Sequence, residues 1–433
     1  MDYNKFLTTT SIKRRNNFTR LSAAEFVDAS IMQAKPTLIS MGGGLPNPQT
    51  FPLLDASLKL SDGTTIEVDA KSMKIALQYL GSKGLPPLID FVNEIQYKVH
   101  NPPTYRAVDH PGQMETILTC GSQDGLCKVI ESMVAENDSI LVEHPAYPGT
   151  LAIVKPLTSN IIPVDSDNDG LNPSSLRQAL SRWSPSEARK LGSGAPKCLY
   201  VVPNGGNPTG TGLTIERKKE IYKISQEYDL IILEDDPYFY LQFTKPYVPS
   251  FLSMDLDGRV VRCDSFSTLI SSGMRLGFVT GPRPLLERLG LHMQCSVVHA
   301  SGIAQMILLK VLEKWGLDGF LRHAENTAEF YKTKRDQCLA AMENHLSGLA
   351  QWSLPSGGMF VWIKLNVEDT YKLITIKTRE KDVLFVPGNI FMLDSTKPCS
   401  YIRASYSKCT EEQMNTAFSR LAEVLREGEP QKM

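Results

Sequence analysis

Five short apolar runs in the sequence each end in a polar loop, and amphipathic stretches follow them. The runs and their loops are METILTC with GSQDG, SILV with EHPAYPG, KCLYVV with PNGGNPTG, DLIILE with DDPY, and GRVVRC with DSFS. Their apolar residues are continuous rather than alternating, as expected of strands that are buried on both faces. The pattern therefore predicts an α/β fold with a mainly parallel central sheet covered by helices.

The character of the sequence changes near residue 330. A long charged helix is predicted over 324–346, a strand over 357–365, and a last helix from Thr410 onward. We expect residues 1–45 to form an N-terminal arm, residues 46–329 a large domain, and residues 330–433 a smaller α/β C-terminal domain. Ligands of open α/β sheets bind beyond the carboxyl ends of the strands, so the site should combine loops that are distant in sequence.

Composition and charge narrow the classes of partner. The 433 residues carry 46 basic and 47 acidic side chains without a long run of either sign, which favours a small molecule over nucleic acid. The eight cysteines show no C-x-x-C pairs and no nearby histidine cluster, so we expect reduced thiols and no metal site. No apolar run approaches the ~20 residues of a membrane helix, and no membrane partner is expected.

The N-terminal segment leaves the compartment open. The first 20 residues, MDYNKFLTTTSIKRRNNFTR, are basic and rich in Ser and Thr, with Asp2 as the single acid. These features fit a mitochondrial transit segment and a solvated arm about equally well. The mitochondrial matrix and the cytoplasm are therefore both left as interpretations.

Two loops have the composition of a phosphate site. Gly121–Gly125 separates a predicted strand from a predicted helix, where backbone N–H groups and the helix dipole attract an anion, and Ser122 adds a hydroxyl. Ser265, Ser267 and Arg275 would complete the cup. Each loop alone is more often an ordinary turn or helix cap, so the phosphate site is a hypothesis at this point.

Four further polar residues follow predicted strands. Asp235 comes at the end of the run DLIILE, where an Asp is usually a cap, but a buried carboxylate can also pair with a protonated heterocycle nitrogen. Tyr147 could stack on a ring, and Asn207 and Tyr238 could donate hydrogen bonds to a phenolic oxygen. Each one singly also fits a surface turn or a core position, and their joint order is more informative.

That order resembles the fold type I pyridoxal-phosphate (PLP) aminotransferases of the kynurenine/α-aminoadipate type. Nearly the entire chain takes part, through GGGLPNPQTFP, ALQY, HNPPT, GSQDGLCKV, PNGGNPTG, RKKEIY, EDDPYFYLQF, DSFS, LISSGMRLGF, GGMFVWIK, VPGN and YIRASYS. The resemblance implies that the large domain binds PLP and that an amino group moves from an L-amino acid to a 2-oxo acid such as 2-oxoglutarate. It also implies a homodimer.

The resemblance assigns cofactor roles to individual residues. Phosphate ligands would be Ser122, Gln123, Ser265, Ser267 and Arg275. Tyr147 would stack on the pyridine ring and Asp235 would pair with the ring nitrogen. Asn207 and Tyr238 would bond the O3′ of the cofactor.

The resemblance also implies a substrate side. It would be lined by Arg20, Gly44, Tyr79, Asn207, Phe360 and Arg403. Arg403 would clamp the substrate α-carboxylate with two parallel hydrogen bonds, which needs a guanidinium rather than an amine. Tyr79 would reach the cofactor site of the neighbouring subunit.

One position departs from the resemblance. Thr268 follows SFS, where the family carries the Schiff-base lysine that holds PLP and moves a proton during transamination. A threonine hydroxyl serves neither purpose near neutral pH, and the sequence has no lysine between Lys245 and Lys310. Three interpretations remain: an aminotransferase with impaired or altered catalysis, a non-catalytic protein that binds PLP or pyridoxamine phosphate (PMP), and a Lys→Thr change that was introduced or is a sequence error.

Overall fold

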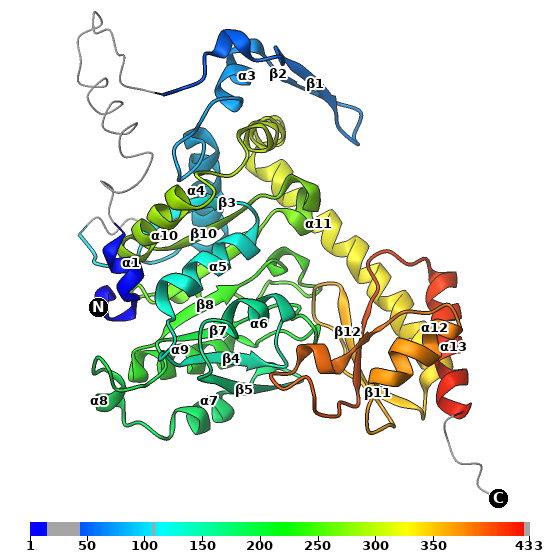
Figure 1. Cartoon of the computed structure of the whole chain (residues 1–433). Coiled ribbons are helices and arrows are strands. Elements are labelled where there is room, and N and C mark those ends of the chain that lie inside the picture. The colour runs from blue at the N-terminus through cyan, green and yellow to red at the C-terminus, as the bar shows by residue number, and fades with distance from the viewer. Residues whose placement is uncertain (15–43, 106–108, 428–433) are drawn as a thin grey trace, which may run out of the picture. The chain divides into compact units, whose positions relative to one another are not determined.

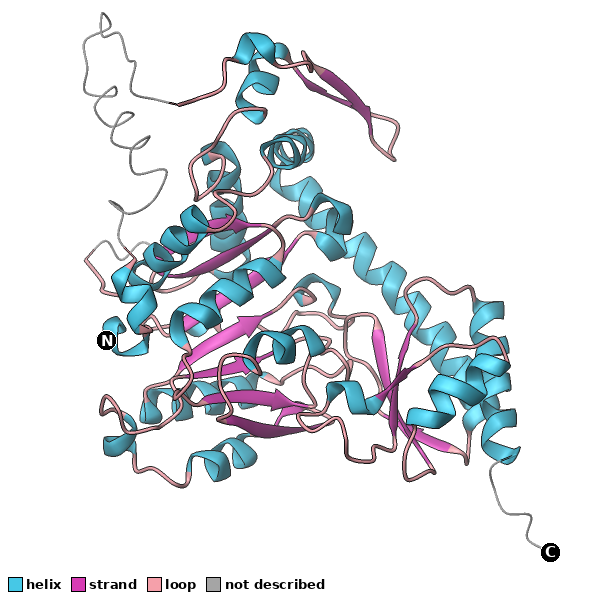
Figure 2. Ribbon diagram, in the orientation of Figure 1, coloured by secondary structure: helices cyan, strands magenta, loops and turns pink. Residues whose placement is uncertain are grey.

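Strands with helices packed beside them build both units of the chain (Figures 1 and 2). The structure, a computed structural model, describes residues 1–14, 44–105 and 109–427. The first unit comprises Met1–Asp138, Ile231–Pro237 and Phe251–Arg322, and the second comprises Ser139–Leu230, Tyr238–Ser250 and His323–Met433. Each unit therefore combines segments that are far apart in sequence.

In the first unit, four strands lie in the order β3 (Met114–Thr119), β10 (Gly277–Pro282), β9 (Val260–Ser265) and β8 (Ile231–Asp235). β8 and β9 are parallel, whereas β10 is antiparallel to both β9 and β3. All residues of β8, and all of β9 except Ser265, are buried, which explains their continuous apolar runs. A separate antiparallel hairpin consists of β1 (Ala56–Lys59) and β2 (Thr65–Val68).

In the second unit, β7 (Cys198–Val201), β4 (Ile140–His144) and β5 (Ile161–Asp167) are parallel, and β6 (Gly170–Leu171) is antiparallel to β5. A smaller antiparallel sheet has the order β11 (Ala350–Trp352), β12 (Phe360–Leu365), β14 (Tyr401–Ser405) and β13 (Val386–Pro387). Apolar residues between Cys338 and Leu425 form a core under this small sheet.

The helical elements differ widely in length. Those of the first unit are η1 (Tyr3–Phe6), α1 (Thr9–Lys13), η3 (Pro48–Thr50), α3 (Ala70–Ala76), α4 (Pro86–His100), α5 (Ser122–Met133), η5 (Leu252–Met254), η6 (Ser267–Ser271), η7 (Ser272–Met274) and α10 (Arg283–Cys295). Those of the second unit are α6 (Pro148–Val154), α7 (Pro173–Leu180), α8 (Pro185–Ala188), α9 (Ile215–Tyr228), η4 (Phe239–Leu241), η8 (Leu373–Lys377), α12 (Thr378–Glu380), η9 (Gly388–Phe391) and α13 (Glu411–Glu427). The long α11 (Gly302–Leu346) is interrupted at Gly316, whose φ is 63°.

Side-chain caps start several of these helices. Asp69 accepts a hydrogen bond from the first turn of α3, Asn172 from that of α7, and Thr214 from that of α9. Such caps satisfy N–H groups that have no partner inside the helix. α5 differs, because its N-cap residue is Gly121 and it receives no capping hydrogen bond from any side chain that the structure describes.

The predicted α/β fold is confirmed, with strands at four of the five predicted apolar runs running parallel to a neighbour. The exception is the first run, which forms β3 and pairs antiparallel with β10. The predicted helix over 324–346 is the second half of α11, and the predicted last helix is α13. The division into an arm, a large domain and a small domain stays a prediction. Within the described ranges, no helix is long and apolar enough to cross a membrane.

Candidate functional site

The N-terminus of α5 and Arg275 form a hydrogen-bond-donating surface in the first unit. Arg275 has a left-handed backbone, with φ at 52°. Its Nη1 donates to the carbonyl oxygen of Ser272 at 3.0 Å and to Oγ of Ser267 at 3.4 Å, while Nη2 donates to the carbonyl oxygen of Cys120 at 3.4 Å. The guanidinium is therefore held against the uncapped start of α5.

Gly121 makes this approach possible. Its φ is 87°, and a Cβ built on it would lie 2.5 Å from Nη2 of Arg275. Ser122 and Gln123 form the first turn of the helix and are half-buried, and the N–H of Ser267 donates to Oγ of Ser265 at 3.1 Å. A cation, a helix dipole and hydroxyl groups at one edge are the donor set that a phosphate requires.

Asp235 and Thr268 lie at the carboxyl ends of two neighbouring strands of the first unit, Asp235 at the end of β8 and Thr268 just after β9. Asp235 ends β8 and is 6% exposed. Thr268 lies in the π-helical turn η6, and its hydroxyl donates to the carbonyl oxygen of Pro237 at 2.8 Å. Thr268 is therefore bonded to the loop that directly follows Asp235, and its side chain has a structural hydrogen bond.

Three of the predicted substrate-side residues, Asn207, Phe360 and Arg403, lie in the second unit, and Arg403 makes contacts with both of the others. From β14, its Nη1 donates to Oδ1 of Asn207 at 2.8 Å, and its guanidinium carbon lies 4.3 Å from the ring centroid of Phe360 and 5.1 Å from that of Phe391. Its Nε is buried and has no hydrogen-bond partner among the described residues. Burial lowers the pKa of Arg403, which nevertheless stays cationic at neutral pH, and nearby Tyr238 and Tyr147 act in the opposite direction.

Close backbone packing brings Asn207 to this place. A Cβ on Gly205 would lie 2.5 Å from the backbone nitrogen of Gly358, and both glycines have positive φ. The glycine-rich loop before Asn207 can therefore lie against the turn that precedes β12. The rings of Tyr238 and Phe360 meet edge to face at a centroid distance of 6.1 Å. Tyr147 begins α6.

The remaining predicted substrate residues are less fixed by contacts. Tyr79 is 43% exposed, and its ring meets that of His299 edge to face at 6.2 Å. Gly44 is the first residue of its described segment, and a Cβ on it would meet nothing within 4 Å among the described residues. Arg20 lies outside the described residues.

The predicted residues thus fall into two groups. The first unit holds Gly44, Tyr79, Ser122, Gln123, Asp235, Ser265, Ser267, Thr268 and Arg275, and the second holds Tyr147, Asn207, Tyr238, Phe360 and Arg403. Phe391 against Arg403 was not predicted, although it follows the motif VPGN, which was available as a signal. No cluster of three or more His, Cys, Asp or Glu residues in the described ranges could hold a metal ion.

Comparisons with protein families, with known sequences and with solved structures agree with one another. The pattern of the family described as aminotransferase class I and II matches residues 55–421. The chain is 47% identical over 429 residues to the Mus musculus protein named kynurenine/alpha-aminoadipate aminotransferase, mitochondrial, covering 99% of this chain and 100% of the relative. The crystal structure of aminotransferase Aro8 from Candida albicans superposes with a TM-score of 0.85 at 27% identity, covering 99% and 98% of the two chains.

A second similar structure contains a cofactor derivative. It is LysN, an alpha-aminoadipate aminotransferase from Thermus thermophilus complexed with N-(5'-phosphopyridoxyl)-L-leucine, at a TM-score of 0.71 and 25% identity over 82% of this chain and 85% of that one. The fold and the polar strand ends define a fold type I PLP-dependent transferase. The chain belongs to the aminotransferase class I and II family, whose cofactor is PLP.

The residues present fit this cofactor. The uncapped start of α5 with Arg275 suits a phosphate dianion, and the buried carboxylate of Asp235 suits a protonated ring nitrogen. The open Nε of Arg403 suits one oxygen of a carboxylate. The donor types and the burial of these residues therefore fit PLP in the first unit and the carboxylate of an amino acid in the second.

Proposed function

We propose that this chain binds PLP or PMP together with an amino acid of the kynurenine or α-aminoadipate type, and that it transfers the amino group to a 2-oxo acid such as 2-oxoglutarate only slowly. The 47% identity to the mouse relative supports the substrate class. The observation that carries the proposal is Arg403, a cation between aromatic rings, paired with Asn207 and with a buried Nε that lacks a partner among the described residues. A substrate carboxylate would supply that partner.

The other residues would hold the cofactor. Ser122, Gln123, Ser265, Ser267 and Arg275 would bind its phosphate, and Tyr147 would stack on its ring. Asp235 would keep the ring nitrogen protonated, and Asn207 and Tyr238 would donate to or accept from O3′. When bound, PLP supplies an electron sink for the charge that develops at the substrate α-carbon.

Thr268 explains why transfer should be slow. Its hydroxyl does not accept a proton near pH 7, and it already donates to the carbonyl oxygen of Pro237. The chain therefore lacks, at this position, the group that would move the proton from the substrate α-carbon. General base catalysis is worth ~10²–10⁴-fold, so the chain should bind its ligands well and turn over poorly.

Assembly and compartment are part of the proposal. Tyr79, 43% exposed, is proposed to complete the cofactor site of a second copy in a homodimer. The mitochondrial name of the mouse relative favours the mitochondrial matrix over the cytoplasm.

A second candidate is a PLP- or PMP-binding protein without turnover. The hydrogen bond from Thr268 to Pro237 favours it, because the threonine has its own structural role in the loop. Equilibrium dialysis with PLP and PMP, followed by single-turnover transfer from α-aminoadipate to 2-oxoglutarate, separates the two. Tight binding with slow glutamate formation supports the first candidate, binding without glutamate supports the second, and no binding of either cofactor form refutes both.

A further inference from the structure

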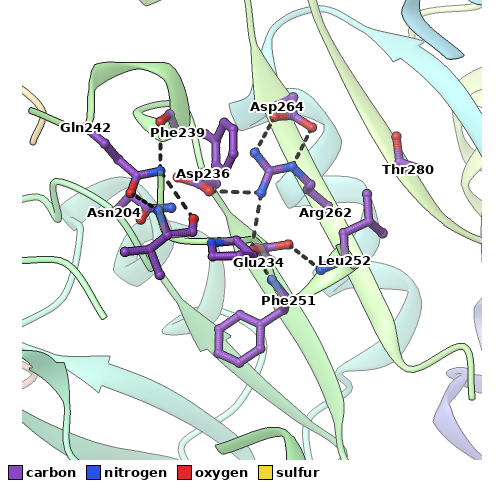
Figure 3. Close-up of polar contacts among 12 residues, drawn as sticks. Asn204, Glu234, Asp236, Phe239, Gln242, Phe251, Leu252, Arg262, Asp264 and Thr280 are labelled. Carbon is purple, nitrogen blue, oxygen red and sulfur yellow. Dashed lines mark hydrogen bonds and ion pairs between the residues drawn. The ribbon is translucent and has the colours of Figure 1, made fainter. Parts of the chain in front are cut away.

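A buried ionic cluster surrounds Arg262 in the first unit (Figure 3). Its Nη1 lies 2.9 Å from Oδ2 of Asp236 and 3.2 Å from Oε1 of Glu234. Its Nε and Nη2 donate to the two carboxylate oxygens of Asp264, at 2.9 and 2.8 Å. The side chains of Arg262, Glu234 and Asp236 are completely buried, and that of Asp264 is 6% exposed.

Strand geometry places this cluster behind the cofactor residues. Glu234 is opposite Arg262 in the parallel pairing of β8 with β9, and Asp235 is opposite Cys263. Because successive side chains of a strand point to opposite faces, Arg262, Glu234 and Asp264 share one face. Asp235 and Ser265 are on the other face, so each of these two residues has a cluster member directly before it in the sequence.

The cluster fixes the backbone on both sides of Asp235. Arg262 binds the residue before Asp235 and the residue after it, and it ties both to β9. Glu234 also accepts hydrogen bonds from the N–H groups of Phe251 and Leu252, at 2.8 and 3.2 Å. Any displacement of Asp235 along or across the sheet would therefore break several buried polar contacts at once.

The charges of the cluster are unequal. One guanidinium faces three carboxylates, and Asp264 receives one further donor, Nε2 of Gln96 at 3.1 Å. The excess of negative charge lies behind Asp235, where little water can screen it. It favours a cation in front of Asp235, and a protonated pyridine nitrogen is such a cation.

Stability alone does not account for these residues. Buried ion pairs are often replaceable by apolar side chains without loss of stability, because removing the charges from water offsets most of their attraction. We infer that Arg262 and its three carboxylate partners are positioning residues that hold Asp235 in place for the ring nitrogen of the cofactor. This inference rests on the proposed function, and none of the four side chains needs to touch the cofactor.

The test is a double-mutant cycle on PMP affinity. Arg262→Lys keeps the charge but loses the planar fork, and Asp264→Asn keeps the shape but loses one negative charge. Each is combined with Asp235→Ala, and the dissociation constant of PMP is measured by fluorescence titration of the folded proteins. Because PMP carries an amine in place of the aldehyde of PLP and no 2-oxo acid is present, this constant reports binding and not turnover.

Residues that act through Asp235 give a non-additive result. Arg262→Lys and Asp264→Asn should each weaken PMP binding about 5- to 50-fold in the unchanged background, and less than twofold when Asp235 is already alanine. The affinity for inorganic phosphate should change less than twofold in all of them. The matched control is Asp257→Asn, which disturbs the ion pair of Asp257 with Arg259 before β9 and should leave PMP affinity unchanged.

The outcomes separate the inference from the proposal that it rests on. Equal losses of PMP affinity in both backgrounds, or unchanged affinity in the single variants, would overturn the positioning role while leaving the proposed function intact. Failure of the unchanged protein to bind PMP would overturn the proposed function and the inference with it. Thermal unfolding without ligand shows which variants are folded. If Arg262→Lys does not fold, the double-mutant cycle is carried out with Asp264→Asn alone.

Discussion

Replacing Glu143 by glutamine should change the pH dependence of stability in a defined direction. Glu143 lies in β4, and its side chain is almost completely buried. Its Oε2 accepts a hydrogen bond from the N–H of Val202 at 2.8 Å, and its Oε1 accepts one from the hydroxyl of Ser166 at 3.1 Å. Burial raises the pKa of Glu143 from 4.5 to about 7, against the opposite effect of these two hydrogen bonds.

The sign and size of the effect follow from this pKa. The folded protein holds the proton of Glu143 more tightly than the unfolded chain does. The stabilisation that the proton on Glu143 contributes to the folded protein is complete below pH 4.5 and is lost as the pH rises through 7. At 1.36 kcal/mol for each pKa unit, the difference between 4.5 and about 7 corresponds to about 3 kcal/mol. Glutamine keeps one carbonyl oxygen for Val202 and an amide that can donate to Ser166, without a titration.

Urea unfolding of both proteins between pH 4.5 and pH 8 measures this difference. The free energy of unfolding of Glu143→Gln minus that of the unchanged protein should rise by about 3 kcal/mol across the range. Glu94→Gln, which changes an exposed carboxylate on α4, is the control and should give a flat difference. Parallel pH profiles for Glu143→Gln and the unchanged protein would refute the reasoning.

Three further predictions concern the proposed site. Arg403→Lys should weaken binding of α-aminoadipate by about 10-fold or more and leave PMP affinity unchanged, because an amine cannot make two parallel hydrogen bonds. Isothermal titration measures the two affinities, and equal affinity of the variant and the unchanged protein for α-aminoadipate would count against the clamp. Asp235→Ala should weaken PMP binding and shift the absorbance of the bound cofactor, and an unchanged spectrum would leave Asp235 as an ordinary strand-end residue. Sedimentation should show a homodimer that Tyr79→Ala leaves assembled but with weakened PMP binding; a monomer that binds PMP fully would contradict the proposal.

The positions of the strands and their polar ends could be predicted from sequence. Continuous apolar runs mark buried strands, and the runs over 231–235 and 260–265 end at Asp235 and Ser265 as expected. The direction of β10 could not be predicted in the same way. A strand buried on both faces has the same apolar pattern whether its neighbours run parallel or antiparallel, so the pattern does not record pairing.

The contacts inside the site were less predictable than its members. The resemblance named Thr268, but only the fold shows its hydroxyl bonded to Pro237, 31 positions earlier in the chain. Arg262 was visible as a charge inside the run GRVVRC, yet its partners depend on the register of β8 with β9. Glycine at position 121 indicates a turn in the sequence, and only the folded structure shows that the missing side chain leaves space for Arg275.

The central claim is that Thr268 limits an otherwise complete site, and Thr268→Lys tests it most directly. Single-turnover transfer from α-aminoadipate to 2-oxoglutarate is compared among the unchanged protein, Thr268→Lys and Thr268→Met, which loses the hydrogen bond to Pro237 without adding an amine. We predict that borohydride fixes PLP to the lysine variant alone and that this variant is faster by ~10²–10⁴-fold or more, with the methionine variant as slow as the unchanged protein. Rapid transfer by the unchanged protein, or no gain in the lysine variant despite bound PLP, would contradict the account.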